Sequence, residues 1–181
     1  MTIIKFILVG LAAVMFLALV KKVFSMSSPV GKNEPFVIMS PFEATITKGG
    51  KPVANTQVKL NYSWNSGSTE EQEGFEVLFN TDTGGKVRMP AIERNIFMSN
   101  LQTTTANYSI KVRLEGEEVV IHSIGKVDPK LHGELDTPAT KFSCELEDPL
   151  KVVVDPRDHD GTLYTTRCKT DVFNQFQQVE I

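Results

Sequence analysis

Cysteine and histidine are scarce in this chain of 181 residues, which contains two cysteines and three histidines. No other cysteine or histidine lies near Cys144 or Cys168 at the short spacing typical of metal ligands. His122, His132 and His159 stand in separate segments. Recurrent short spacings of these residue types mark metal sites, and none occurs here. We therefore expect no metal and no cofactor, with the histidines in solvated or hydrogen-bonded roles.

The two cysteines nevertheless form the one possible pair. A lone pair in a small translocated domain most often forms a structural bridge, which predicts a Cys144–Cys168 disulfide. The alternative is two separate buried thiols, since free cysteine is among the most buried residue types.

Catalytic motifs are also missing. The chain has no G-x-S-x-G, no H-E-x-x-H, no P-loop and no dinucleotide-binding fingerprint. We expect a protein that is not an enzyme, and a hydrolase whose site is assembled from distant residues is the minor alternative.

Positive charge is concentrated at the start of the chain. The first 33 residues contain four lysines and no acid, whereas the whole chain has 19 basic and 22 acidic residues. The remainder is therefore acidic and has no basic stripe. Nucleic-acid binding depends on clustered Lys and Arg, so this class of function is excluded.

An apolar run, Phe6–Val20, stands near the N-terminus and approaches the roughly 20 residues that span a bilayer when its flanks are included. Lys21 and Lys22 follow it, and no cysteine marks a lipoprotein. We expect an uncleaved signal-anchor helix over residues 1–24, and the alternative is a cleaved signal peptide. Residues 25–41, which contain several prolines, are expected to be a linker, and residues 42–181 to be the folded domain.

The orientation of this anchor is not decided by charge. Lys5 lies on one side of the apolar run and Lys21 and Lys22 on the other, a small bias toward a cytoplasmic domain. The cysteine pair favours an oxidising compartment. We expect a bacterial inner-membrane protein with its domain in the periplasm.

Alternation of apolar and polar residues predicts strands. Val58, Leu60, Tyr62 and Trp64 occupy every second position, and the same period recurs over Phe42–Ile46, Phe75–Phe79 and Tyr108–Leu114. Glycine, proline and asparagine separate these runs. The fold class is therefore all-β, a sandwich of about seven to nine strands. We expect one helical turn at 94–100 and a loop at 127–140.

Two motifs carry a family resemblance. The turn G-K-P-V-A-N-x-x-V at 50–58 and the downstream T-D-x-G-G-K-V at 81–87 resemble carboxypeptidase regulatory-like, transthyretin-type β-sandwich modules. This resemblance implies a transthyretin/immunoglobulin-like fold and a non-catalytic binding or spacer role. Trp64 and the segment GELDTPATKFSCELE at 133–147 are similar to a narrower group of bacterial envelope proteins of unassigned function. Some of that group neighbour type VI secretion components, which implies an immunity or accessory role.

The candidate binding residues are acidic and lie in two segments. One contains Glu70, Glu71 and Glu73, and the other contains Asp158 and Asp160. Loops on a rigid sandwich commonly carry recognition, so we expect a protein partner there, either an effector or an envelope component. D-H-D-G at 158–161 also resembles part of a calcium loop, but the third ligand and the downstream Glu are missing. We therefore expect a plain turn or an acidic recognition tip there, and calcium binding is the minor alternative.

Overall fold

The computed structural model describes residues 31–65, 74–99, 103–127, 130–135, 141–154 and 163–180. The expected anchor helix at 1–24 lies outside these ranges. Within the described part of the chain, no helix is both long and apolar enough to cross a membrane.

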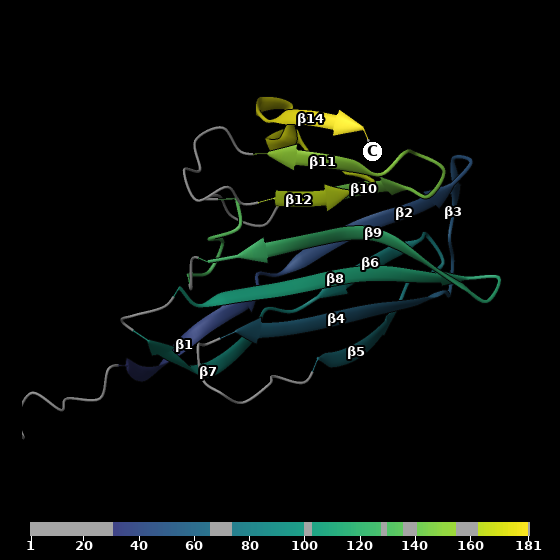
Figure 1. Cartoon of the computed structure of the whole chain (residues 1–181). Coiled ribbons are helices and arrows are strands. Elements are labelled where there is room, and N and C mark those ends of the chain that lie inside the picture. Colours follow the sequence, from purple (N-terminus) through teal and green to yellow (C-terminus); the bar gives the residue numbers. More distant parts are fainter. Residues whose placement is uncertain are drawn as a thin grey trace, which may run out of the picture.

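The domain consists of three sheets, and most of their neighbouring strands are antiparallel (Figure 1). The largest has seven strands in the order β14 (Gln177–Glu180), β11 (Lys151–Val154), β12 (Leu163–Thr166), β9 (Glu117–Lys126), β8 (Thr105–Leu114), β4 (Gln57–Asn65) and β5 (Phe75–Asn80). Behind it in Figure 1 lies a second sheet of β13 (Cys168–Lys169), β10 (Lys141–Glu145), β2 (Phe42–Lys48), β3 (Lys51–Pro52) and β6 (Lys86–Met89). The third sheet pairs β1 (Gly31–Met39) with β7 (Ile92–Ser99), and a 3-10 turn, η1, spans Asp171–Gln175.

The predicted all-β class and sandwich-like layering are confirmed, although fourteen strands occur in the described residues instead of seven to nine. The predicted alternation is also confirmed. Val58, Leu60 and Tyr62 of β4 are buried while the residues between them are half-exposed. Their buried face packs against the second sheet, which makes one continuous hydrophobic core.

Tight turns have the chemistry that their geometry requires. Gly49 and Gly50 both adopt positive φ between β2 and β3, a conformation that costs glycine little. At Gly85 (φ 75°) a Cβ would lie 2.5 Å from the Ile46 carbonyl oxygen, so a side chain does not fit there. Glu115 and Gly116, also at positive φ, form the two-residue turn of the β8–β9 hairpin.

Two sequence-based expectations were wrong. The expected linker at 25–41 is in large part β1, and Phe36, Ile38 and Met39 are fully buried in the core. Of the helical turn expected at 94–100, residues 94–99 belong to β7, which pairs with β1, and residue 100 lies outside the described residues. Each segment is stabilised by the other, a long-range pairing that local periodicity does not reveal.

Two prolines divide this long hairpin. Met39 pairs with Ile92 and Phe42 pairs with Met89, so the register continues across the break and places Pro41 opposite Pro90. Neither residue has a backbone N–H, and the ladder is interrupted where they face each other. Strands β1 and β2, and likewise β6 and β7, are therefore single runs broken by proline.

Trp64 packs against a residue of the neighbouring strand. Its ring stacks on Phe75 of β5, with centroids 5.2 Å apart and planes 1° apart. Tyr62 lies beside both rings and accepts a 2.6 Å hydrogen bond from Arg94. Phe75 remains 42% exposed, so this aromatic stack sits at the edge of the core.

The predicted disulfide is present. Cys144 of β10 and Cys168 of β13 are directly opposed in an antiparallel register and are joined through sulfur. Their Cα atoms are 4.0 Å apart, just below the usual range of 4.4–6.8 Å. The bridge connects the second sheet to the C-terminal segment that returns to the first.

One end of the seven-stranded sheet collects many chain connections. Strands β4 and β9 end there, and β8 and β12 begin there (Figure 1). The register partners at this end are Asn65 with Thr105, Ala106 with Lys126, Ile124 with Tyr164, and Leu163 with Val154. We call this end of the strands the loop end. The β8–β9 turn lies at the opposite end of the strands.

Candidate functional site

The acidic residues predicted from the sequence lie outside the described residues. Glu70, Glu71 and Glu73 fall in 66–73, and Asp158 and Asp160 fall in 155–162, together with the candidate calcium loop and His159. The strands next to these segments are described. Strand β4 ends at the loop end just before residues 66–73, and residues 155–162 connect the end of β11 to the start of β12 at the same loop end. Strands β4 and β12 are three positions apart in the sheet, a separation of roughly 14 Å at standard strand spacing.

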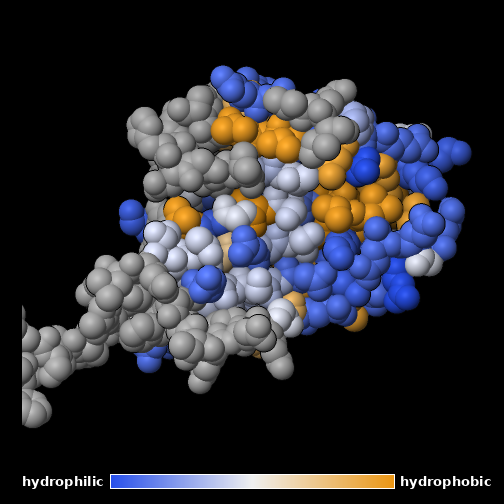
Figure 2. Space-filling view, viewed as in Figure 1, coloured by the Kyte–Doolittle hydropathy of each residue, from blue (hydrophilic) through white to orange (hydrophobic). Residues whose placement is uncertain are grey.

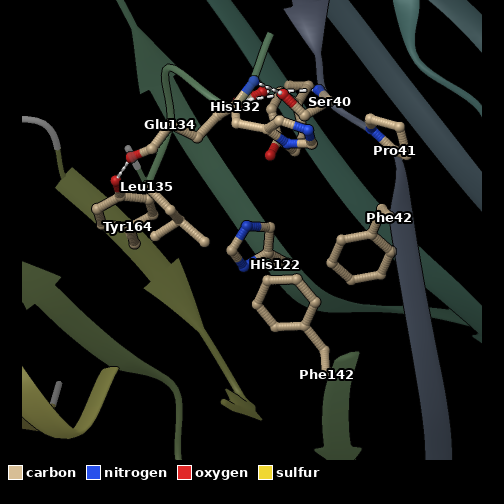
Figure 3. A pocket seen from close by; sticks show the side chains of 10 residues that line it. Ser40, Pro41, Phe42, His122, His132, Glu134, Leu135, Phe142 and Tyr164 are labelled. Atoms are coloured by element: carbon tan, nitrogen blue, oxygen red, sulfur yellow. Dashed lines mark hydrogen bonds between the residues drawn. The ribbon is translucent and has the colours of Figure 1, made fainter. Parts of the chain in front are cut away.

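A buried polar cluster centred on Glu134 lies near the same end (Figure 3). The Glu134 carboxylate accepts hydrogen bonds from the Ser40 backbone N–H at 2.7 Å and from the Ser40 hydroxyl at 2.5 Å. Lys126 Nζ lies 3.2 Å from the same carboxylate, with side chains only 1% and 6% exposed. Lys126 also donates to the Lys130 carbonyl oxygen at 2.8 Å. The charge of Glu134 is thereby compensated on two sides.

The proline break explains why Ser40 is available. Because the ladder is interrupted at Pro41 and Pro90, the Ser40 N–H bonds to a side chain instead of to a strand. The Ser40 oxygen in turn accepts the His132 backbone N–H at 2.7 Å. The turn that contains His132 and Glu134 is thus fastened to the end of β1.

Two tyrosines complete the cluster. Tyr164 of β12 donates its hydroxyl to the Glu134 backbone carbonyl. Tyr108 of β8 also lines the cavity beside these residues. Burial, and after it the nearby charge of Glu134, raises the pKa of Tyr108 well above its usual value of 10.0. Tyr108 is therefore neutral at physiological pH.

His122 lies deeper, among aromatic rings. Phe42 and Phe142 lie 5.6 and 5.4 Å from its ring centroid, and Nδ1 is 3.1 Å from the Thr166 hydroxyl. Burial lowers the pKa of His122 to about 4. The expected hydrogen-bonded role of this histidine is confirmed, and the ring is neutral near pH 7.

The cavity between these groups has a volume of about 30 Å³, enough for one or two waters. His122 and His132 both line it, but within the described residues no group of three His, Cys, Asp or Glu side chains could hold a metal. Chemically, the cluster holds a carboxylate paired with Lys126, the neutral imidazole of His122 and the neutral phenol of Tyr108. These are the properties of a polar network that fixes loops to a core.

Sequence reasoning missed Ser40, Lys126 and Glu134. The position of Lys126 could have been predicted, because it stands two residues after Ile124 and so points to the same face of β9. In the structure Lys126 is 1% exposed. Ser40 and Glu134 are 94 residues apart and stand in segments that the sequence assigned to a linker and a loop. Only the tertiary fold brings them together.

The outer face of the seven-stranded sheet offers a different kind of surface. A shallow hollow of about 210 Å³ is lined by uncharged polar side chains: Asn61, Ser63, Asn107, Ser109 and Ser123. Figure 2 shows this face, with pale, mildly polar residues across its middle. Such a surface has donors and acceptors but no charge.

Comparison with known proteins gives one family. No curated protein and no solved structure matches the chain. The family model that matches has the description "Domain of unknown function (DUF6795)" and covers residues 42–149. It includes β2 through β10 and the whole Glu134 cluster except Ser40 and Tyr164. Since the match spans more than half of the chain, the protein belongs to the DUF6795 family.

Proposed function

We propose that this protein is a non-catalytic binding module tethered to the inner membrane of a bacterial envelope, with its domain in the periplasm. The loop end is its binding surface, and a protein is its partner. The transthyretin-type resemblance of residues 50–58 and 81–87 supports the binding role, while the Cys144–Cys168 bridge supports an oxidising compartment.

The observation that carries the proposal is the common position of the strand ends. Strands β4 and β11 end at the loop end, and β12 begins there, so the two acidic segments are joined to the sheet at this end. Glu70, Glu71, Glu73, Asp158 and Asp160 therefore belong to connections that leave one edge of a rigid sheet. An acidic surface built from these two connections would suit a basic patch on a partner, where charge complementarity speeds association and sets specificity.

The most concrete form of this proposal is an immunity-type protein that neutralises a secreted effector, such as one delivered by a type VI system. An acidic surface would cover the effector's site when the effector reaches the periplasm. Genes beside the one that encodes this chain are the first place to look for that effector.

Protection from such an effector tests the proposal. The neighbouring effector is expressed in the periplasm together with the wild type or with Glu70→Gln/Glu71→Gln/Glu73→Gln/Asp158→Asn/Asp160→Asn. The wild type should restore growth and the neutralised variant should fail. Glu115→Gln/Glu117→Gln is the matched control, because it changes acids at the opposite end of the same sheet. Equal protection by all three proteins would overturn the proposed surface.

A structural or accessory scaffold is the second candidate, favoured by the start of β1 at Gly31. If residues 1–24 form the anchor, 25–30 can span at most roughly 20 Å, so the domain would stay close to the bilayer. Gly31 pairs with Ser99, near the loop end, which would then face other membrane components. Deletion of the gene separates the two candidates: a scaffold leaves an envelope assembly incomplete without any effector present.

A further inference from the structure

A second cavity, distinct from the Glu134 cluster, lies beside the disulfide. It has a volume of about 220 Å³ and is enclosed by β11, β12, β13, η1 and β14. Its lining includes Asp148, Arg167, Cys168, Lys169 and Thr170. This volume is somewhat below that of drug-sized ligand sites, so it suits a small molecule.

Thr170 is the first sign that something binds there. Its side chain is buried, with the residue 9% exposed, and within the described part of the chain its Oγ1 has no hydrogen-bond partner. Although Thr170 precedes η1, its hydroxyl makes no capping bond. Buried polar groups in native proteins nearly always have a partner, so this hydroxyl lacks a group that the cavity can supply.

Arg167 is the second sign. Its guanidinium donates to three backbone carbonyls, those of Val120, Leu146 and Asp148. No carboxylate of the described residues lies within ion-pair distance of it, unlike Lys169, which pairs with Asp148 at 2.7 Å. Neutral carbonyls hold the guanidinium in place without cancelling its charge. The wall of the cavity is therefore positively charged at Arg167.

The disulfide fixes this arrangement. Cys168 lines the cavity between Arg167 and Thr170, and its bridge to Cys144 ties that segment to β10. The Cys168 N–H also donates to the Thr166 hydroxyl at 2.9 Å. A charged donor and an unpartnered hydroxyl are thus held on one rigid wall, which lowers the entropic cost of binding.

We propose that this cavity binds a small oxyanion with a carboxylate or phosphate group, which takes its charge complement from Arg167 and a hydrogen bond from Thr170. The Nε–H and both Nη1–H groups of Arg167 already donate to carbonyls, so Nη2 is the nitrogen that donates to an oxygen of either kind of oxyanion. This site is separate from the proposed partner surface, and either can exist without the other.

Calorimetric titration of the full-length protein in detergent tests the site. Sodium phosphate and sodium succinate are the probes, in separate titrations at constant ionic strength, and glucose is the neutral control. At least one oxyanion should bind with one-to-one stoichiometry, and the better probe identifies the chemical group. Failure of both oxyanions to bind, or equal binding of glucose, would overturn the proposal.

Two threonine variants give the decisive comparison. Thr170→Val keeps the shape of the side chain and removes the hydroxyl, so oxyanion affinity should fall about tenfold or more. Thr165→Val, on the neighbouring strand and outside the cavity, should leave affinity unchanged. Without ligand, Thr170→Val should have an equal or higher melting temperature, because it removes an unpartnered buried hydroxyl. Unchanged oxyanion affinity in Thr170→Val would contradict the site.

Discussion

Lys126 Nζ and Glu134 Oε2 form an ion pair of 3.2 Å in which both side chains are almost fully buried. The pair connects the end of β9 to the turn that Ser40 fastens to β1. Removing one partner from such a pair leaves an uncompensated charge in a medium where it is poorly solvated. The Glu134 cluster is therefore expected to control the stability of the loop end.

Lys126→Met should reduce the free energy of unfolding by about 3–5 kcal/mol, because Glu134 would stay buried without its cation. The double variant Lys126→Met/Glu134→Gln should recover part of this loss. Lys59→Met is the control: Lys59 lies 2.6 Å from Glu118, which is 34% exposed, and its loss should cost far less than that of Lys126 because water screens the pair. Urea unfolding measures all three variants, and similar values for Lys126→Met and Lys59→Met would contradict the assignment.

The disulfide should stabilise the domain by roughly 3 kcal/mol in the chain-entropy model for a loop of this length. Cys144→Ala/Cys168→Ala should lose this amount in urea unfolding and should no longer respond to reductant. Thiol labelling of the unreduced, denatured wild type should find no free cysteine. Two labelled cysteines would show that the bridge is absent from the protein as it is made.

His122 predicts a loss of stability in mild acid. The unfolded chain takes up a proton near pH 6.5, whereas the folded chain does so only near pH 4. Stability is therefore fully present above pH 6.5 and is lost as the pH falls to 4, by up to about 3 kcal/mol. His122→Phe, which suits the surrounding aromatic rings, should flatten the stability profile in this window. An unchanged slope in the variant would mean that another group titrates.

Glu145 affects the stability of the fold in a more acidic pH range than His122 does. Its carboxylate accepts backbone N–H bonds from Gly50, Glu147 and Gly49 and a hydroxyl bond from Thr47, which lower its pKa to about 2 against a usual value of 4.5. Its contribution to stability is present above pH 4.5 and is lost between 4.5 and 2. Glu145→Gln should therefore remove part of the acid dependence in this range, measured by thermal unfolding at a series of pH values. Identical profiles for variant and wild type would contradict this role.

The sequence was sufficient for those parts of the fold that local pattern determines. The alternations from Val58 to Trp64 and from Tyr108 to Leu114 both led to the correct strands, because each strand buries one face. The cysteine pair was also predicted, since only one pairing is possible.

Other parts depend on contacts between distant segments. Strand β1 contains Gly31 and Pro35, which favour a linker, yet it is held by pairing with β7 at the edge of the fold. The Ser40–Glu134 contact spans 94 residues and requires the proline break as well. No periodicity in either segment encodes that contact.

The proposed attachment of the domain to the periplasmic side of the membrane is the central claim, because both the binding proposal and the expected oxidising compartment depend on it. A periplasm-dependent reporter enzyme and a cytoplasm-dependent one are fused in turn after Ile181, and the fusions are followed in membranes washed with high salt. We predict that only the periplasmic reporter is active and that the protein stays with the membrane. Activity of the cytoplasmic reporter alone would reverse the orientation and contradict the proposed envelope function.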